Sequence, residues 1–218
     1  MTMLSRTIRI LVATPLLTLV AITAAIVASG SHRRLGATRE EARRALPGDE
    51  LLDRADIQAD RAITIAAAPD RVWPWIAQLG QDKGGFYSFE WAENLAGCDI
   101  HNADQIVHEW QDPHVGDPFP LHPEMVLTVG RVETGRALVA TSKGGSAPQD
   151  SGMDFTWAFV ISALPPTPTT PLATRLHVRE RYRSSSPAVR AGVEVVNLIS
   201  TVMSWRMTRT IKQLAERP

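Results

Sequence analysis

The last part of the chain, residues 184–216, has the pattern of one long helix. Ser186 supplies an N-cap hydroxyl, and Pro187 stands at the first helical position, where its missing N–H leaves no hydrogen bond unmade. Apolar residues then recur in steps of three and four: Val189, Val193, Val196, Ile199, Met203, Met207, Ile211 and Leu214. A second apolar ridge beside them consists of Val195, Leu198, Val202 and Trp205. Such a helix, about 45 Å long, needs a broad apolar partner, so we expect a sheet that curves around it.

Length and composition limit the class of protein. The 218 residues, of which 44% are hydrophobic, suffice for one well-cored domain plus a tail. Lys+Arg and Asp+Glu both number 23, so the net charge is zero and no basic field favours nucleic acid. We therefore expect no nucleic-acid partner. The single cysteine, Cys98, excludes an intrachain disulfide and a multi-cysteine metal site, and we interpret it as a small apolar filler.

The N-terminal segment 10–28 carries no charge across nineteen residues, close to the roughly 20 that cross a bilayer. Two interpretations compete, an uncleaved membrane anchor and a secretory signal peptide that is cut near Ala28. The apolar run exceeds the usual 7–15 residues of a signal peptide's core, which favours the anchor. We predict a single-pass protein of the cell membrane. Arginines flank the run on both sides, so the side of the soluble domain stays open.

The remaining chain divides by its patterns into a linker or lead-in segment, 35–60, and a folded domain, 61–218, behind the anchor region 1–34. Alternation of apolar and polar residues predicts a first strand at 61–66, followed by helices at 69–79 and 86–95. A loop with a short edge strand leads to three further strands at 126–132, 137–142 and 153–164, and 175–183 is the last strand. Strand, two helices, antiparallel strands and a long closing helix is the order of an α+β helix-grip fold, here with an N-terminal transmembrane helix.

Several segments strengthen that interpretation. The stretch 66–75 (AAAPDRVWPW) resembles the entrance of SRPBCC domains, the START and birch-pollen-allergen-like superfamily. The stretch 85–95 (GFYSFEWAENL) is similar to a segment of its actinobacterial polyketide cyclase/dehydrase-like subgroup, as are 115–117 (VGD) and 174–176 (TRL). The resemblance covers about residues 61–216. It implies a cavity between the concave sheet and the long helix, sized for an apolar ligand.

Four residues of the segment 86–95 are candidates for the cavity wall. Tyr87, Glu90, Trp91 and Asn94 are spaced i, i+3, i+4 and i+7 and would share one helix face. Two aromatic rings, a carboxylate and an amide together are typical of a small-molecule pocket. The alternative is that the rings pack in the core while Glu90 and Asn94 satisfy backbone groups. Within the resemblance, Trp91 would line the cavity, and Glu90 or Tyr87 would be its polar group.

Further wall residues are expected on the strand and the helix that would enclose the cavity: Trp157, Val202 and Trp205. Four histidines lie at positions 101, 108, 114 and 122, but their spacings match no compact metal site, and we predict neither metal nor cofactor. His177, Arg179 and Arg181 alternate along the last strand, and we expect them to be solvated charges if their face points outward. If the face points inward, an arginine would need an anionic partner such as Glu90 or a ligand carboxylate.

The sequence suggests a binding function or an enzymatic one, and a third possibility is an interaction or structural protein whose cavity is filled by its own aromatic side chains. The first is a membrane-anchored binding or carrier domain for a hydrophobic small molecule or lipid. The alternative is a cyclase- or dehydratase-like enzyme that uses a Tyr, Glu or His in the same cavity as general acid or base. The sequence leaves open whether the protein is an enzyme, although binding is favoured.

Overall fold

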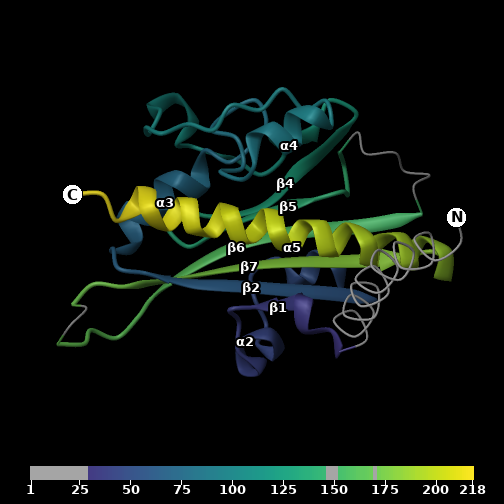
Figure 1. Ribbon diagram of the computed structural model, residues 1–218, viewed down its shortest axis with the longest axis horizontal. Helices are drawn as coiled ribbons and strands as arrows, with labels where there is room; N and C mark the ends of the chain where they lie inside the picture. The colour runs from purple at the N-terminus through teal and green to yellow at the C-terminus, as the bar shows by residue number, and fades with distance from the viewer. Residues whose placement is uncertain (1–28, 146–151, 169–170) are drawn as a thin grey trace, which may run out of the picture. The chain divides into compact units, whose positions relative to one another are not determined.

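The computed structural model describes residues 29–145, 152–168 and 171–218 (Figure 1). The chain divides into two compact units, Met1–His32 and Arg33–Pro218. The predicted span 10–28 lies outside the described residues. Among the residues that are described, no helix is both long and apolar enough to cross a bilayer. The sheet and the long closing helix both belong to the second unit.

A seven-stranded sheet with the order β1-β2-β7-β6-β5-β4-β3 is the centre of this unit (Figure 1). Its strands are β1 (Arg34–Leu35), β2 (Ile57–Ile65), β3 (Pro118–His122), β4 (Met125–Glu133), β5 (Ala137–Thr141), β6 (Met153–Ala163) and β7 (Thr174–Ser184). All neighbours pair antiparallel except β1 and β2, which are parallel. The predicted strands are present, within one or two residues, from β4 to β7. The first long strand begins at Ile57, four residues before the predicted start.

The closing helix α5 (Pro187–Ala215) crosses one face of the sheet, as predicted (Figure 1). The Ser186 hydroxyl accepts a hydrogen bond from the Val189 N–H, the expected N-cap. Val193, Met207, Ile211 and Leu214 are buried in the main core. The core also takes the buried face of α3 (Pro69–Ala77), including Val72, Trp73 and Ile76. A largely antiparallel sheet held against a long C-terminal helix fits the helix-grip α+β class.

The middle of α5 is less buried than its pattern predicts. The second ridge is largely exposed, with Val202 56% and Trp205 41% accessible, and Val195 is also exposed. Conversely Asn197, a polar residue that belongs to neither apolar ridge, is completely buried. Its amide Nδ2 lies 3.5 Å from Glu180 Oε2. The helix therefore turns a partly polar face toward the sheet at this level, because a buried carboxylate there needs donors.

The opposite face of the sheet is covered by the segment before β2. It contains α2 (Arg39–Arg43), whose Thr38 and Glu41 form a capping box, and the short 3-10 helix η2 (Asp49–Leu52). Leu46 and Leu51 pack on a small second core of Ala137, Val139, Ala158 and Val160. Residues 35–60 were predicted to be a linker or lead-in segment; in the structure they contact the sheet closely and share its compact unit.

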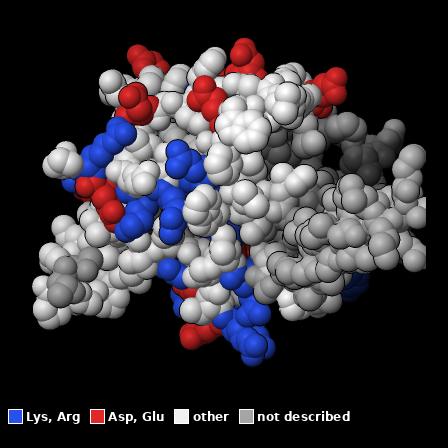
Figure 2. Space-filling view, viewed as in Figure 1, with Lys and Arg blue, Asp and Glu red and all other residues white. Residues whose placement is uncertain are grey.

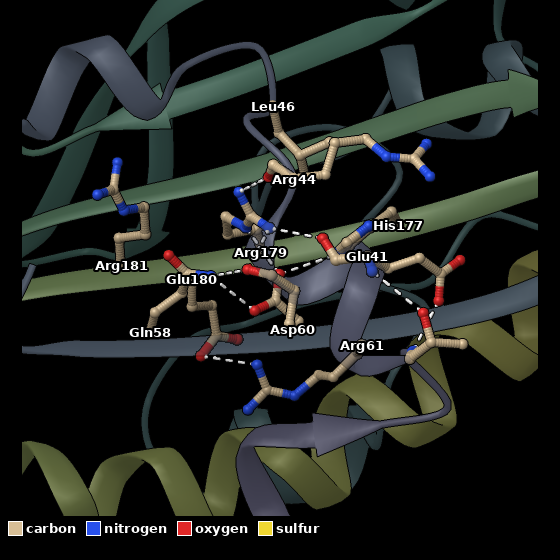
Figure 3. A network of polar contacts seen from close by, with 12 residues as sticks. Glu41, Arg44, Leu46, Gln58, Asp60, Arg61, His177, Arg179, Glu180 and Arg181 are labelled. Atoms are coloured by element: carbon tan, nitrogen blue, oxygen red, sulfur yellow. Dashed lines mark hydrogen bonds and ion pairs between the residues drawn. The ribbon is translucent and has the colours of Figure 1, made fainter.

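Buried polar contacts fasten this segment to the sheet (Figure 3). Arg179 donates from Nε to Asp60 Oδ1 at 2.7 Å and from Nη1 to Asp49 Oδ2 at 2.7 Å. Its remaining N–H groups reach the carbonyls of Glu41, Ala42 and Arg44. His177 and Arg179 do point outward, but both are buried, so the expectation that they are solvated is wrong. Residues 41–49 cover them, and all five guanidinium donors of Arg179 find acceptors.

Candidate functional site

A cavity of about 470 Å³ lies between the sheet and α5. It is closed on a third side by α4 (Glu90–Leu95) and the segments that flank it. Its apolar wall consists of Phe86, Ile100, Leu121, Met125, Met153, Phe155, Trp157, Val196, Ile199, Met203 and Met207. Val196 and Ile199 line it although they are 53% and 61% exposed, so the cavity reaches the surface beside α5. Its volume falls in the range of small-molecule pockets, about 300–1,000 Å³.

The floor of the cavity carries a buried ion pair. Glu180 of β7 lies 3.1 Å from Arg61 Nη1 of β2, and the two side chains are 2% and 1% exposed. The Tyr182 hydroxyl donates to Glu180 Oε2 at 2.9 Å, and the Ser200 hydroxyl of α5 donates to Oε1. Arg61 in turn donates to the Thr201 hydroxyl at 3.2 Å. The charge of Glu180 is therefore neutralised within the protein by Arg61. The contacts of the pair with Ser200 and Thr201 also connect β2 and β7 to the middle of α5.

Strand register explains why these two side chains meet. Ala59 pairs with Glu180, and Arg61 pairs with Val178, so Arg61 and Glu180 are diagonal neighbours on one face of the sheet. On the next strand Trp157 pairs with Glu180, and Phe155 pairs with Tyr182, whose ring it stacks on at 4.7 Å. The same alternation that sends Leu176 and Val178 into the core thus also sends a carboxylate and its aromatic neighbours to the cavity floor.

A second carboxyl, Glu93 of α4, lines the opposite side of the cavity with Cys98 and His122. Glu93 Oε2 is buried and has no hydrogen-bond partner among the described residues. Burial, together with the charge of Glu90, raises the pKa of Glu93 to about 7. Burial and the charge of Glu93 also raise the pKa of Cys98, so its thiol is a weak S–H donor, directed to the Leu121 carbonyl. Glu93 is thus a carboxyl of this wall that changes charge near neutral pH.

Of the residues predicted for the wall, Trp157 lines the cavity. Tyr87 is fully buried in the main core, where its ring stands edge-on to Trp75 and its hydroxyl accepts from Gln78 Nε2 at 2.9 Å. Burial raises the pKa of Tyr87 well above its usual range. A phenol in this position is a packing residue and does not exchange protons near neutral pH.

Glu90 and Asn94 satisfy backbone groups, as the alternative interpretation of these two residues predicts. Glu90 accepts from the Asn102 N–H at 3.0 Å, and this hydrogen bond is the main reason why its pKa is lowered. Asn94 exchanges two hydrogen bonds with the backbone of Ile100. Trp91, by contrast, is 71% exposed. Glu90, Trp91, Asn94, Val202 and Trp205 are not among the side chains that line the cavity.

A local turn explains why the predicted residues of segment 86–95 do not line the cavity. The predicted helix 86–95 begins only at Glu90, because Tyr87 adopts a left-handed conformation with φ 56°. Asn102 holds the turn: its Oδ1 accepts from the Tyr87 N–H at 2.6 Å, and its Nδ2 donates to the Ser88 carbonyl. Tyr87 therefore does not share a helix face with Trp91, and the inward position of the shortened helix is Glu93.

The wall residues Glu180 and Glu93, and Arg61, the buried partner of Glu180, are absent from the predicted set. Two of them leave a signal in the sequence. Arg61 interrupts the apolar positions Ala59, Ile63 and Ile65 of β2, and Glu180 interrupts those of β7. Opposite charges within the inward positions of two strands indicate a buried pair. Glu93 leaves no comparable signal, because its orientation depends on where α4 begins.

Comparisons with known proteins add little to this picture. No protein-family model and no curated protein sequence matches the chain. Solved structures similar to it include a Mesorhizobium loti protein, at 20% identity and a TM-score of 0.40, over 72% of this chain and 96% of that one. Norcoclaurine synthase from Thalictrum flavum is 15% identical, with a TM-score of 0.42, over 72% of this chain and 85% of that one. CalU16 from Micromonospora echinospora is 15% identical, with a TM-score of 0.36, over 73% and 83% respectively. None of the three reaches a TM-score of 0.5, so the architecture rests on the strand order and packing of this chain.

Proposed function

We propose that residues 33–218 form a binding domain for an apolar small molecule or lipid, held in the cavity between the sheet and α5. The observation that carries this proposal is the cavity itself: about 470 Å³ in volume and lined mainly by aromatic, Met, Leu and Ile side chains. A space of this size with apolar walls costs stability when empty, because its lining forfeits dispersion contacts that a ligand restores. The similarity of residues 85–95 to the polyketide cyclase/dehydrase-like subgroup supports a ligand-binding role.

Native mass spectrometry of the purified protein tests the proposal. We expect a population of intact protein heavier than the polypeptide mass, and denaturation should release the extra mass as a small organic molecule. A protein that carries no such mass, and that acquires none after incubation with a lipid and metabolite extract of its host, would contradict the proposal.

The anchor at residues 10–28 remains part of the proposal. Its uncharged length supports a single span that holds the domain at the cell membrane. After cell lysis the full-length chain should sediment with membranes, resist alkaline carbonate extraction and keep its original N-terminus. A soluble product that begins near residue 31 would instead identify the segment as a signal peptide.

Acid–base catalysis is a second candidate function, and Glu93 favours it. A carboxyl with a pKa of about 7 in an apolar cavity can both accept and donate a proton near neutral pH. The molecule identified by mass spectrometry decides between the two functions. If that molecule is recovered chemically unchanged after prolonged incubation with fresh protein, the protein is a carrier; if it is converted by wild type and not by Glu93→Gln, the protein is an enzyme.

A further inference from the structure

The polar groups of the cavity wall differ in whether the protein satisfies them. Glu180 accepts from Tyr182 and Ser200 and pairs with Arg61. The Ser88 hydroxyl donates to the Met203 carbonyl at 3.2 Å. His122 accepts from the Glu124 N–H through Nδ1 and contacts the Ala96 carbonyl through Nε2 at 3.1 Å, so both of its ring nitrogens have partners. These groups have little hydrogen-bonding capacity left for a ligand.

Two buried polar atoms on the wall lack a hydrogen-bond partner among the described residues, Glu93 Oε2 and the indole nitrogen of Trp157. Only Glu93 can carry a charge. No Lys or Arg belongs to the described lining, so no permanently charged cation of the wall compensates that charge. Glu90, one helical turn earlier on α4, adds to the negative potential there. A carboxylate placed in an apolar cavity is costly unless a cation meets it.

The surroundings of Glu93 also suit a cation. Phe86, Phe155, Trp157 and Tyr182 present aromatic rings to the cavity, and the faces of such rings attract ammonium groups. Outside the cavity, acidic side chains gather along the upper margin of the molecule, over α4 and the loop after it (Figure 2). Asp99, Asp104, Glu109 and Asp112 of that loop are exposed. Acidic side chains on this surface favour the approach of cations over that of anions.

We propose that the ligand of this cavity is an apolar organic cation, such as a hydrophobic amine, with the Glu93 carboxylate as its counter-ion. The inference rests on the proposed binding function and narrows it to one chemical class. It disfavours fatty acids and other carboxylates, since the described wall offers them no Lys or Arg. Glu180 is not the counter-ion, because Arg61 already neutralises it.

Three probes that differ in charge test whether the cavity prefers a cationic ligand. Nile red, a neutral dye, is first bound to the wild-type protein at about pH 8, where Glu93 is ionised. It is then displaced by naphthylmethylamine, naphthylmethanol or naphthoic acid, which share one ring system and carry a positive, zero or negative charge. We expect the amine to bind at least about tenfold more tightly than the alcohol, a difference of about 1.4 kcal/mol, and the acid to bind most weakly.

Variants assign the preference to Glu93. Glu93→Gln keeps the shape of the side chain without its charge, so the amine and the alcohol should bind it equally. Glu109→Gln, which removes an exposed carboxylate from the same side of the molecule, should keep the preference of wild type. Lowering the pH from about 8 to about 5.5 should weaken amine binding to wild type several-fold, because Glu93 then takes up a proton.

Other titratable groups near Glu93 are Glu90 on α4, which also contacts His101, and Cys98 and His122 on the cavity wall. If protonation of His122 caused the pH dependence of amine binding, that dependence would persist in Glu93→Gln, and the proposal would be wrong. Equal binding of amine and alcohol to wild type, or an unchanged preference in Glu93→Gln, would also overturn it while leaving a hydrophobic binding site intact. Absence of Nile red binding would remove the binding function itself, and with it this inference.

Discussion

Arg61 and Glu180 form the most deeply buried ion pair of the described residues, and each charge depends on the other. We predict that Glu180→Leu lowers the free energy of unfolding by about 3–5 kcal/mol, because it leaves the Arg61 guanidinium buried without a counter-charge. The double variant Arg61→Met/Glu180→Leu should recover much of this loss. Urea denaturation of wild type, Arg61→Met, Glu180→Leu and the double variant gives the four free energies of unfolding. If the loss of unfolding free energy in the double variant equals the sum of the losses in the two single variants, the two residues are not energetically coupled.

Glu93 should make stability depend on pH in a direction opposite to that of most carboxyls. Its pKa is raised to about 7 in the folded state, so folding favours the protonated form. The stability that this group contributes is present at acid pH and is lost as pH rises through about 7. The free energy of unfolding of Glu93→Gln, whose side chain is always neutral, should therefore exceed that of wild type by about 1–2 kcal/mol at about pH 8 and equal it near pH 4.

Denaturant unfolding of wild type and Glu93→Gln at the two pH values checks this prediction, with Glu109→Gln as the exposed control. A stability difference that is the same at acid and alkaline pH would mean that Glu93 titrates normally in the folded protein.

At the scale of elements, long periodic segments were predictable. The 29 residues of α5, its Ser186 cap and strands β4 to β7 follow directly from the period of their apolar residues. The bounds of short segments were not predictable, because tertiary contacts determine where these segments begin and end. Asn102, fifteen residues away, fixes the turn at Tyr87 and so delays the start of α4. The position of Trp91 depends on that start, which explains why Trp91 lies on the surface, whereas Trp157, on a regular strand, lies on the cavity wall.

The segment before β2 was also beyond local patterns, because its partners lie on distant strands. Its charged residues are typical of a surface linker, yet Glu41, Ala42 and Arg44 supply backbone acceptors for Arg179. Gly48 approaches Val139 so closely that an added Cβ would stand 2.6 Å from Cγ1. Such a contact requires a residue without a side chain.

Truncation tests the role of this segment. A protein that begins at Arg33 should fold with the stability of the intact domain. A protein that begins at Arg54, which the sequence patterns predict to be folded, should be several kcal/mol less stable, because it exposes Val139 and Val160 and leaves Arg179 without most of its acceptors. Thermal unfolding compares the two. Melting temperatures that agree within about a degree or two would mean that the segment is a linker after all.

At the scale of the whole domain, α5 serves two surfaces at once. One end of the helix closes the main core through Met207, Ile211 and Leu214. Its middle forms one wall of the cavity through Val196, Ile199 and Met203, beside the exposed Val202 and Trp205. Figure 2 shows basic side chains near the C-terminal end of α5 and acidic ones over α4. The domain thus combines a rigid core with an adjacent apolar space on the same helix.

The most direct test of the central claim is Nile red titration of three proteins that differ on α5. Met203→Trp places a large ring in the cavity, whereas Val202→Trp places the same ring on the neighbouring exposed position. We predict saturable binding to wild type and Val202→Trp, and at least about tenfold weaker binding to Met203→Trp, because the larger ring projects into the space beside α5 that the dye would occupy. If folded Met203→Trp binds Nile red as tightly as wild type does, the dye lies elsewhere, and the cavity between the sheet and α5 is not the binding site.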